Sequence, residues 1–278
     1  MKLKIISYNI LADYLNSPNY IKVDKKYLDN DNRIKLLLKK LKKLITNESI
    51  FCLQEVGYLQ LSILQTFFFK HKFQMIYTGD LAIAFPFEKF KIKKLELGYI
   101  KDLKYLIDKK HHEQLDSKKK FYIILTLRSI KKNRNFTIAN THLIASPELN
   151  NLKFLQTAVL LKKLDEYYNV ILCGDFNSKP DYDNIKLIQN NEINNSLGKF
   201  KINNKYNIAH DLDQITTHTN NIASGIFTEM LDYIVVQKNI KINSVSKLKK
   251  RDKYNSKNIL PNKTEPSDHI VIYADVSI

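Results

Sequence analysis

Residues 171–178 read ILCGDFNS, an apolar run that ends in Gly174 and is followed by Asp175 and Asn177, two positions apart. If the run is a buried strand, its period of two predicts both polar side chains on one side of the strand's carboxyl end. A carboxylate and an amide presented together can bind a hard cation, a water or a phosphate oxygen. Because α/β sheets keep their chemistry at strand ends, this stretch indicates an α/β enzyme.

Other apolar runs also carry a polar residue near one end. Taken singly, each has an ordinary explanation, since such residues usually serve turns and a lone histidine is usually structural. Together with residues 171–178 they make six segments in one chain, which favours an assembled site over independent accidents. The runs are IISYNIL (5–11) with Asn9, IFCLQEV (50–56) with Glu55, FTIANTHL (136–143) with Asn140 and His142, LDYIVV (231–236) with Asp232, and PSDH (266–269) with His269 before an alternating strand at 270–276.

This ordered set resembles the exonuclease–endonuclease–phosphatase superfamily of metal-dependent phosphodiesterases. Further matches place it nearest the branch of the deadenylases, nocturnin, the angel proteins and the 2′-phosphodiesterases. They are SYNILADYLNSPNY, FCLQEV, GDLAIAF…KF, NTHLIASPELNNLKFLQTAVLLKKL, CGDFNSKPD, FTEMLDYI and LPNKTEPSDH. The resemblance runs from Ile5 to about Tyr273, and Leu95–Lys120 shows no family pattern.

The resemblance implies a four-layer α/β sandwich, in which two mixed β-sheets pack face to face and helices flank them. Residues 1–145 and 170–278 would each supply one sheet. The expected site draws on Asn9 and His269, near opposite ends of the chain, so we expect one catalytic domain over residues 1–278. Helices are expected at 32–46, from a 3.6-residue apolar period, and at 147–167, with Ser146 as N-cap and Pro147 first. We expect 101–120 to be an exposed insertion or mobile loop.

Phosphodiester hydrolysis needs an activated water and neutralised phosphoryl oxygens. Glu55 is the expected Mg²⁺ ligand, with Asn9 beside it, and Mn²⁺ is a possible substitute. Asp175 and Asn177 would orient the water or bind a second metal; one- and two-metal mechanisms both stay open. His269 is the candidate general base, because the ordinary pKa of histidine lies near neutral pH.

Three more residues complete the expected catalytic set. Asp232 would hold the His269 ring in the right tautomer, and His142 would donate to a phosphate oxygen with Asn140 supporting it. Pro147 lies five residues after His142 and Phe227 five before Asp232. In the resembled deadenylases, residues at these places sandwich an adenine near the GDFN asparagine, here Asn177. Helix initiation would equally explain Pro147, and a core position would equally explain Phe227.

The sequence therefore favours a Mg²⁺-dependent 3′→5′ exoribonuclease with a preference for poly(A). The alternatives are a 2′-phosphodiesterase on 2′,5′-oligoadenylate or a nocturnin-like nucleotide 2′-phosphatase; a DNA endonuclease or a catalytically dead RNA-binding module fits less well. The expected partner is RNA or an adenylate-containing nucleotide. The leucine-rich repeats that attach some deadenylases to a larger complex are absent, so we do not expect recruitment by that route.

Charge and composition are consistent with this function but do not establish it. The chain has 45 Lys and Arg against 28 Asp and Glu, a net charge of +17, which suits a polyanionic substrate. A chain so rich in Lys, Asn and Ile would be basic regardless of function. Cys52 and Cys173 lie in apolar runs, where free thiols fit better than a disulfide. With no signal peptide or transmembrane segment seen, we expect a cytoplasmic protein with no membrane partner.

Overall fold

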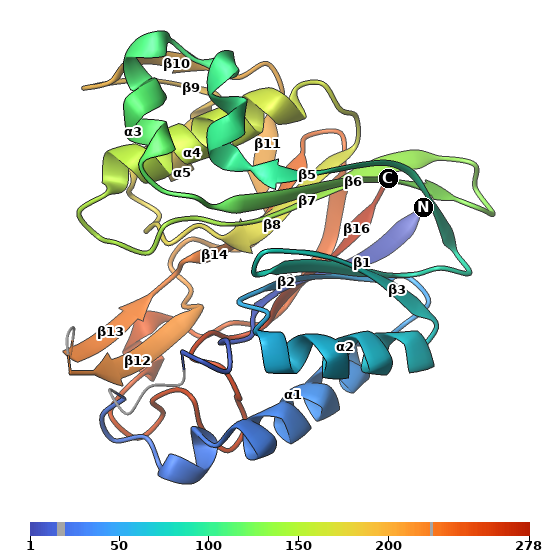
Figure 1. The fold of residues 1–278 in the computed structure, drawn as a ribbon, viewed down its shortest axis with the longest axis vertical. Coiled ribbons are helices and arrows are strands. Elements are labelled where there is room, and N and C mark those ends of the chain that lie inside the picture. Colours follow the sequence, from blue (N-terminus) through green and yellow to red (C-terminus); the bar gives the residue numbers. More distant parts are fainter. Residues whose placement is uncertain (16–19, 223–224) are drawn as a thin grey trace.

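The computed structural model describes residues 1–15, 20–222 and 225–278, and within them the strands form two six-stranded sheets and two hairpins. The first sheet has the order β15-β16-β1-β2-β4-β3 and the second the order β11-β14-β8-β7-β6-β5. Figure 1 shows the two sheets stacked, with α1 and α2 outside the first and α4 and α5 outside the second. The expected four-layer α/β sandwich is confirmed.

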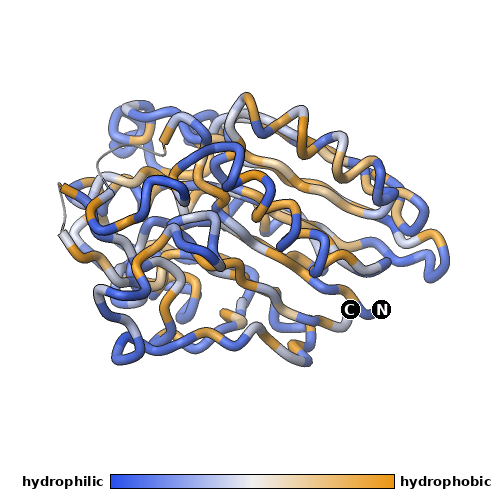
Figure 2. Tube along the Cα trace, turned by 90° about the horizontal axis from the view of Figure 1, so that it is seen from below, coloured by the Kyte–Doolittle hydropathy of each residue, from blue (hydrophilic) through white to orange (hydrophobic). Residues whose placement is uncertain are grey.

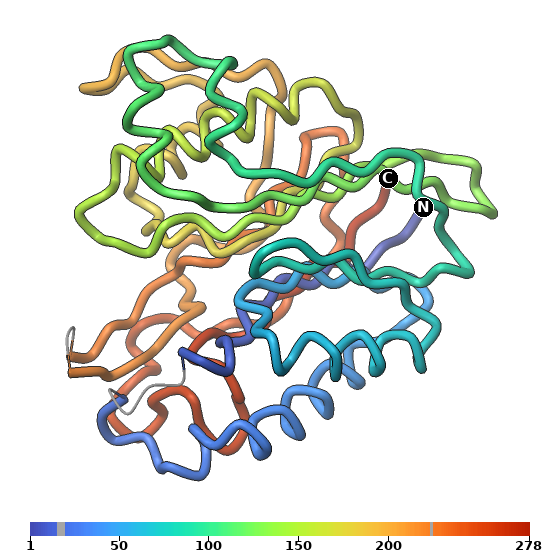
Figure 3. The backbone as a smooth tube through the Cα atoms, in the orientation of Figure 1, coloured from blue at the N-terminus to red at the C-terminus, as the bar shows by residue number. Residues whose placement is uncertain are grey.

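The first sheet joins strands from both ends of the chain. Its strands are β1 (Lys2–Asn9), β2 (Ser49–Gln54), β3 (Phe73–Thr78), β4 (Leu81–Pro86), β15 (Lys241–Val245) and β16 (Ile272–Ser277). β16 pairs antiparallel with β1, so the two termini meet, and the Met1 ammonium donates to the Ile278 carbonyl at 2.5 Å. Figure 3 shows both ends side by side.

The second sheet takes all its strands from the middle of the chain, and no strand of the first sheet lies between them in sequence. It contains β5 (Phe90–Tyr99), β6 (Phe121–Ser129), β7 (Asn135–His142), β8 (Val170–Asp175), β11 (Tyr206–Ile208) and β14 (Asp232–Gln237). The expected division of the sheets between residues 1–145 and 170–278 is therefore wrong. The chain leaves the first sheet after β4 and returns to it only at β15, because the last strands complete the hydrogen bonding of the edge that β1 would otherwise expose.

Apolar side chains fill three layers. One cluster lies between the sheets, where β2 contributes Cys52 and β8 contributes Cys173. Both thiols are free and buried, as expected. The other two clusters lie under the helices α1 and α2 and under α4. Figure 2 shows the orange, hydrophobic stretches running through the interior, with hydrophilic turns around the rim.

The helices differ in detail from those expected. α1 spans Asn30–Leu44, with the Asp29 carboxylate accepting from Asn32 N as N-cap, two residues earlier than the expected start. α2 spans Tyr58–Lys70 and α5 Asp183–Asn190. α4 spans Asn150–Leu164, so Ser146 is not its N-cap and Pro147 is not its first residue. Residues 147–148 instead form a turn, closed by Leu149 N donating to the Ser146 carbonyl.

Residues 95–120 are ordered, contrary to the expectation of an exposed loop over 101–120. They hold the end of β5, the 3₁₀ helices Ile100–Leu106 and Lys109–His111, and α3 (His112–Asp116). Ile100, Leu103 and Leu115 are buried in the cluster that packs on α4. These widely spaced apolar residues anchor a segment whose lysines remain at the surface. None of the described helices is long and apolar enough to cross a membrane.

Candidate active site

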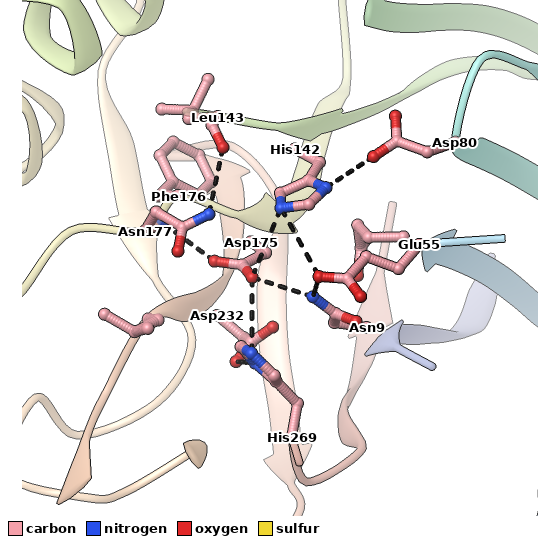
Figure 4. A network of polar contacts seen from close by, with 12 residues as sticks. Asn9, Glu55, Asp80, His142, Leu143, Asp175, Phe176, Asn177, Asp232 and His269 are labelled. Atoms are coloured by element: carbon pink, nitrogen blue, oxygen red, sulfur yellow. Dashed lines mark hydrogen bonds and ion pairs between the residues drawn. The ribbon is translucent and has the colours of Figure 1, made fainter. Parts of the chain in front are cut away.

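The polar residues at the strand ends converge on one rim of the sandwich (Figure 4). β1 and β2 run parallel with Asn9 opposite Gln54, and β7 and β8 run parallel with His142 opposite Asp175. β14 runs antiparallel to β8 and begins with Asp232 opposite Asp175. Each parallel pair therefore brings its carboxyl ends to the same edge, and the two sheets place these edges face to face.

Asn9 joins two carboxylates from different sheets. Its amide Nδ2 donates to Glu55 Oε1 at 2.9 Å and to Asp175 Oδ2 at 3.0 Å, and its Oδ1 accepts from Leu11 N at 3.1 Å. Glu55 follows β2 in a left-handed conformation, with φ of 55°, and its Oε2 accepts from Ala12 N at 3.2 Å. Burial raises the pKa of Glu55, while the charge of His142 opposes that rise. The acid is thus held in place in a site that favours a nearby positive charge.

The second carboxylate, Asp175, needs a glycine before it. A Cβ on Gly174 would lie 2.3 Å from the Thr141 carbonyl oxygen of β7. Gly174 lies opposite Thr141 in the parallel ladder, so a side chain there would force the strands apart. The GD sequence at 174–175 therefore sets the spacing between His142 and Asp175.

His269 forms a buried pair with Asp232. Nδ1 of the ring lies 2.7 Å from Asp232 Oδ2, and Nε2 lies 3.6 Å from Asp175 Oδ2. Burial alone would lower the pKa of His269, but the Asp232 and Asp175 carboxylates outweigh it and hold that pKa well above its ordinary value. The Ser267 hydroxyl donates to the Asn9 carbonyl and accepts from His269 N, which fixes the His269 loop against β1.

His142 forms a second pair of this kind, with Asp80. Its Nδ1 lies 2.6 Å from Asp80 Oδ2, while Nε2 faces Glu55 Oε1 at 3.9 Å and Asp175 Oδ2 at 3.8 Å. Burial would raise the pKa of Asp80, but its hydrogen bond to His142 holds that pKa below the ordinary value. The ionised Asp80 carboxylate accepts a hydrogen bond from the ring and so orients Nε2 towards Glu55 and Asp175.

Asn177 reaches the site by a turn and not by strand periodicity. β8 ends at Asp175, and Asn177 has φ of 47°, with its backbone N donating to Asp175 Oδ1 at 2.8 Å. Its side chain donates to the Leu143 carbonyl at 3.0 Å. The sequence predicted Asn177 beside Asp175 from the period of two of a strand. That reason is wrong, because β8 ends at Asp175 and Asn177 lies in the turn that follows.

Asn140 is fully used by the protein itself. Its Nδ2 donates to the carbonyls of Leu53 and Ala82, and its Oδ1 accepts from Gln54 Nε2 at 2.7 Å. These partners all belong to the first sheet, so Asn140 ties the two sheets together behind the site. None of these contacts joins Asn140 to His142, and its support of His142 stays a prediction.

The two expected base-stacking residues lie outside this polar cluster. Pro147 is exposed in the turn before α4. Phe227 is half-buried on β13 (Gly225–Glu229), which forms a hairpin with β12 (Thr217–Asn221). Figure 1 shows this hairpin projecting from the sandwich. Phe227 is thus not a core residue, which removes one of the two explanations left open by the sequence.

Sequence reasoning missed two supporting residues. Asp80 is the partner of His142, and the GD at 79–80 was a visible signal because it marks the turn between two apolar strands, β3 and β4. Arg33 is buried in α1 and donates to the carbonyls of Pro266, Ile10 and Leu11. It clamps the His269 loop to the segment after Asn9. A single arginine in a lysine-rich amphipathic helix gives no such signal.

The donor set fits a divalent cation. Ligand atoms of Glu55, His142 and Asp175 all lie within 4.8 Å of one another, and so do those of Asp175, Asp232 and His269. Carboxylate oxygens with one imidazole suit a hard cation, and the partially buried acids gain from positive charge. Asp175 belongs to both groups and links them.

A match to a family model shows which family of proteins this chain belongs to. The model of the Endonuclease/Exonuclease/phosphatase family matches residues 6–269, which span the chain from β1 to His269. The chain belongs to this family. Its members are hydrolytic enzymes that generally depend on a divalent metal, which agrees with the carboxylate and histidine cluster.

Relatives in the Endonuclease/Exonuclease/phosphatase family fall in the branch expected from the sequence. A probable CCR4-Not complex 3′-5′-exoribonuclease subunit Ccr4 from Enterocytozoon bieneusi is 29% identical over 75% of this chain and 44% of its own. Human 2′,5′-phosphodiesterase 12 is 25% identical over 99% of this chain and 51% of its own. The chain thus spans about half the length of these two relatives.

Solved structures show the same fold. ANGEL2, a 2′,3′-cyclic phosphatase, aligns with a TM-score of 0.85 at 19% identity, over 99% of this chain and 95% of its own. The human nocturnin catalytic domain, with a bound sulfate anion, aligns with a TM-score of 0.72 at 21% identity, over 99% and 93%.

Proposed function

We propose that this chain is a Mg²⁺-dependent 3′→5′ exoribonuclease with a preference for poly(A), acting as one catalytic domain over residues 1–278. The observation that carries the proposal is that three side chains of the site surround the same carboxylate, Asp175. One of its oxygens, Oδ2, lies within 4 Å of Asn9 Nδ2, His142 Nε2 and His269 Nε2. A base, a cation site and a phosphate-binding imidazole can therefore act on one phosphodiester.

Glu55 and Asp175 would hold the cation with their oxygen atoms, with Asn9 beside them, and Mg²⁺ or Mn²⁺ suits such ligands. When bound, such an ion neutralises phosphoryl oxygens and stabilises negative charge on the leaving oxygen. The remaining roles belong to the protein. His142, oriented by its pairing with Asp80, donates from Nε2 to a phosphoryl oxygen.

His269 takes the proton of the attacking water at Nε2, while Asp232 retains the proton on Nδ1 and stabilises the imidazolium that forms. This role needs a neutral ring, so the pKa of His269 must fall from its raised value. Positive charge near Asp175 acts in that direction. Asp175 and Asn177 orient the water beside the ring.

Adenine preference rests on Phe227, Pro147 and Asn177. A half-buried phenylalanine on a projecting hairpin and an exposed proline offer two faces for stacking a base. Similarity to the Enterocytozoon bieneusi Ccr4 subunit supports RNA as the substrate. The second candidate is a 2′-phosphodiesterase on 2′,5′-oligoadenylate or a nocturnin-like 2′-phosphatase, which the similarity to human 2′,5′-phosphodiesterase 12 over 99% of this chain supports.

The test is a comparison of substrates under one set of conditions. Purified protein with Mg²⁺ is incubated with poly(A), mixed-sequence RNA, 2′,5′-oligoadenylate, NADP, RNA ending in a 2′,3′-cyclic phosphate, and single-stranded DNA. We expect the fastest release of 5′-AMP from poly(A). Faster cleavage of 2′,5′-oligoadenylate or NADP would decide for the second candidate, and failure on every substrate would contradict both.

A further inference from the structure

The two six-stranded sheets in the described part of the chain expose four edges, and three of these carry features that discourage pairing with another strand. β15 has a bulge between Ile242 and Ser244, and β5 has one between Ile92 and Lys94 together with several lysines. β11 is only three residues long. Bulges, lysines and short length are the usual ways to protect a sheet edge.

The fourth edge, β3, has none of these features. It reads FQMIYT over Phe73–Thr78, without charge, proline or bulge, and pairs in regular register with β4 alone. No other segment among residues 1–15, 20–222 and 225–278 hydrogen-bonds to its outer side. A regular, uncharged, unpaired edge is a template for a further strand.

The register shows which backbone groups are available. β3 and β4 are joined by the two-residue turn Gly79-Asp80, which makes Thr78 and Leu81 a hydrogen-bonded pair. At the other end Phe87 N donates to the Lys72 carbonyl, in phase with that pair. Every second residue of β3 therefore faces β4, and the N–H and C=O groups of Phe73, Met75 and Tyr77 point outward.

An apolar groove lies beside this edge. It has a volume of about 870 Å³ and lies between the end of α2 and β3, lined by Gln65, Thr66, Phe69, Lys70, Phe73, Gln74, Met75 and Phe87. Phe69 is 71% exposed, and its ring lies 6.4 Å from that of Phe87. Phe73, Met75 and Tyr77 pack on the helix side of the sheet, so an added strand would place alternate side chains in this groove.

We propose that β3 binds an extended segment of another protein, in which apolar residues alternate and acidic residues flank them. Main-chain hydrogen bonds to Phe73, Met75 and Tyr77 would give affinity, and the groove would select the alternating side chains. Acidic flanks match Lys70, which lines the groove, and the net charge of +17. The same charge opposes pairing with a second copy of this chain.

The test is selection from a displayed library of random nonapeptides, with the full chain as target and Met75→Pro as counter-target. Proline at position 75 removes an outward N–H and leaves the hydrogen bonds to β4 intact, as edge strands tolerate. We expect enriched peptides to alternate apolar residues and carry Asp or Glu, and to bind Met75→Pro about tenfold or more weakly. Replacing their acidic residues by Lys should also weaken binding.

Two further measurements guard against misfolding and wrong placement. Met75→Glu keeps the N–H but puts a negative charge beside the groove, so it should weaken binding of the acidic peptides while the melting temperature stays near that of the unmodified protein. Hydrogen exchange should slow at Phe73, Met75 and Tyr77 when an enriched peptide binds. Absence of enrichment, binding to the position-75 variants as tight as to the unmodified protein, protection elsewhere, or a dimer that Met75→Pro dissociates would overturn the proposal.

Discussion

Asp80 Oδ2 lies 2.6 Å from His142 Nδ1, and this contact links the two sheets across the active-site rim. Asp80 belongs to the turn between β3 and β4 of the first sheet, whereas His142 ends β7 of the second. The pairing sets the orientation of the ring. Nε2 of His142 therefore faces Glu55 and Asp175 across the rim.

The first prediction follows from this pair. Asp80→Asn should lower kcat about 10- to 100-fold, since loss of a carboxylate partner of this kind weakens histidine function by that amount. The double variant Asp80→Asn/His142→Ala should be no slower than His142→Ala alone, because both changes act on one ring. Additive losses in kcat would show that Asp80 acts independently of His142.

The second prediction concerns the cation. Glu55→Ala should abolish Mg²⁺-dependent hydrolysis and the heat of Mg²⁺ binding measured by calorimetry, because it removes a partly buried carboxylate beside Asn9 and Asp175. Glu48→Ala, which removes an exposed carboxylate just before β2, is the matched control and should behave as the unmodified protein. Undiminished hydrolysis in EDTA, or by folded Glu55→Ala, would reject the assignment of the metal.

The third prediction separates chemistry from binding. His269→Ala should reduce kcat by about 10²–10⁴-fold, the usual contribution of a general base, while the affinity for RNA measured in Ca²⁺ changes little. Phosphate and base contacts supply most of that affinity, and His269 acts on water. If binding and turnover fall together, the residue is structural.

The fourth prediction tests the adenine contact. Phe227→Ala should slow degradation of poly(A) more than of poly(U), since stacking on an aromatic ring contributes about 1–3 kcal/mol per base and adenine has the larger face. Phe227 is half-buried on a hairpin, so its truncation should destabilise the fold by less than the about 3–5 kcal/mol of a core phenylalanine. An unchanged poly(A)/poly(U) rate ratio would argue against stacking.

The fifth prediction concerns pH and Glu265, whose carboxylate binds the Tyr8 hydroxyl and the Lys40 ammonium. Burial raises the pKa of Glu265 from 4.5 to about 7, against the opposing charge of Lys40. The folded state therefore holds this proton more tightly than the unfolded chain. Its contribution to stability is full below about pH 4.5 and is lost as the pH rises to about 7.

Denaturant titrations at pH 5 and pH 8 measure this effect. The free energy of unfolding of the unmodified protein should contain a component that falls over this interval, and Glu265→Gln should lack it. Equal pH dependence of the two proteins would contradict the raised pKa. Glu48→Gln again provides an exposed control.

Much of the site could be read from the sequence because its residues sit at the ends of apolar strands. The polar positions in IISYNIL, FCLQEV, ANTH, GDFN and LDYI are local features. Parallel pairing carries the first four to one rim, and the antiparallel strand β14 adds Asp232 at its amino end. Asp80 also lies next to an apolar strand in the sequence, but no role in the site could be assigned to it from that position. Its function depends on a histidine 62 residues away, which no local pattern reports.

The sequence by itself indicated an α/β chain and the residues that gather at the rim, because strand periodicity and strand ends are local properties, and its family resemblance implied the two-sheet sandwich. Only the tertiary structure decided how the strands divide between sheets, that Asn140 ties the sheets together, and that residues 95–120 are packed. It also revealed Arg33 as a clamp and β3 as an open edge. Each of these depends on partners distant in sequence, and hydrogen bonding and burial between distant segments are settled only when the chain has folded.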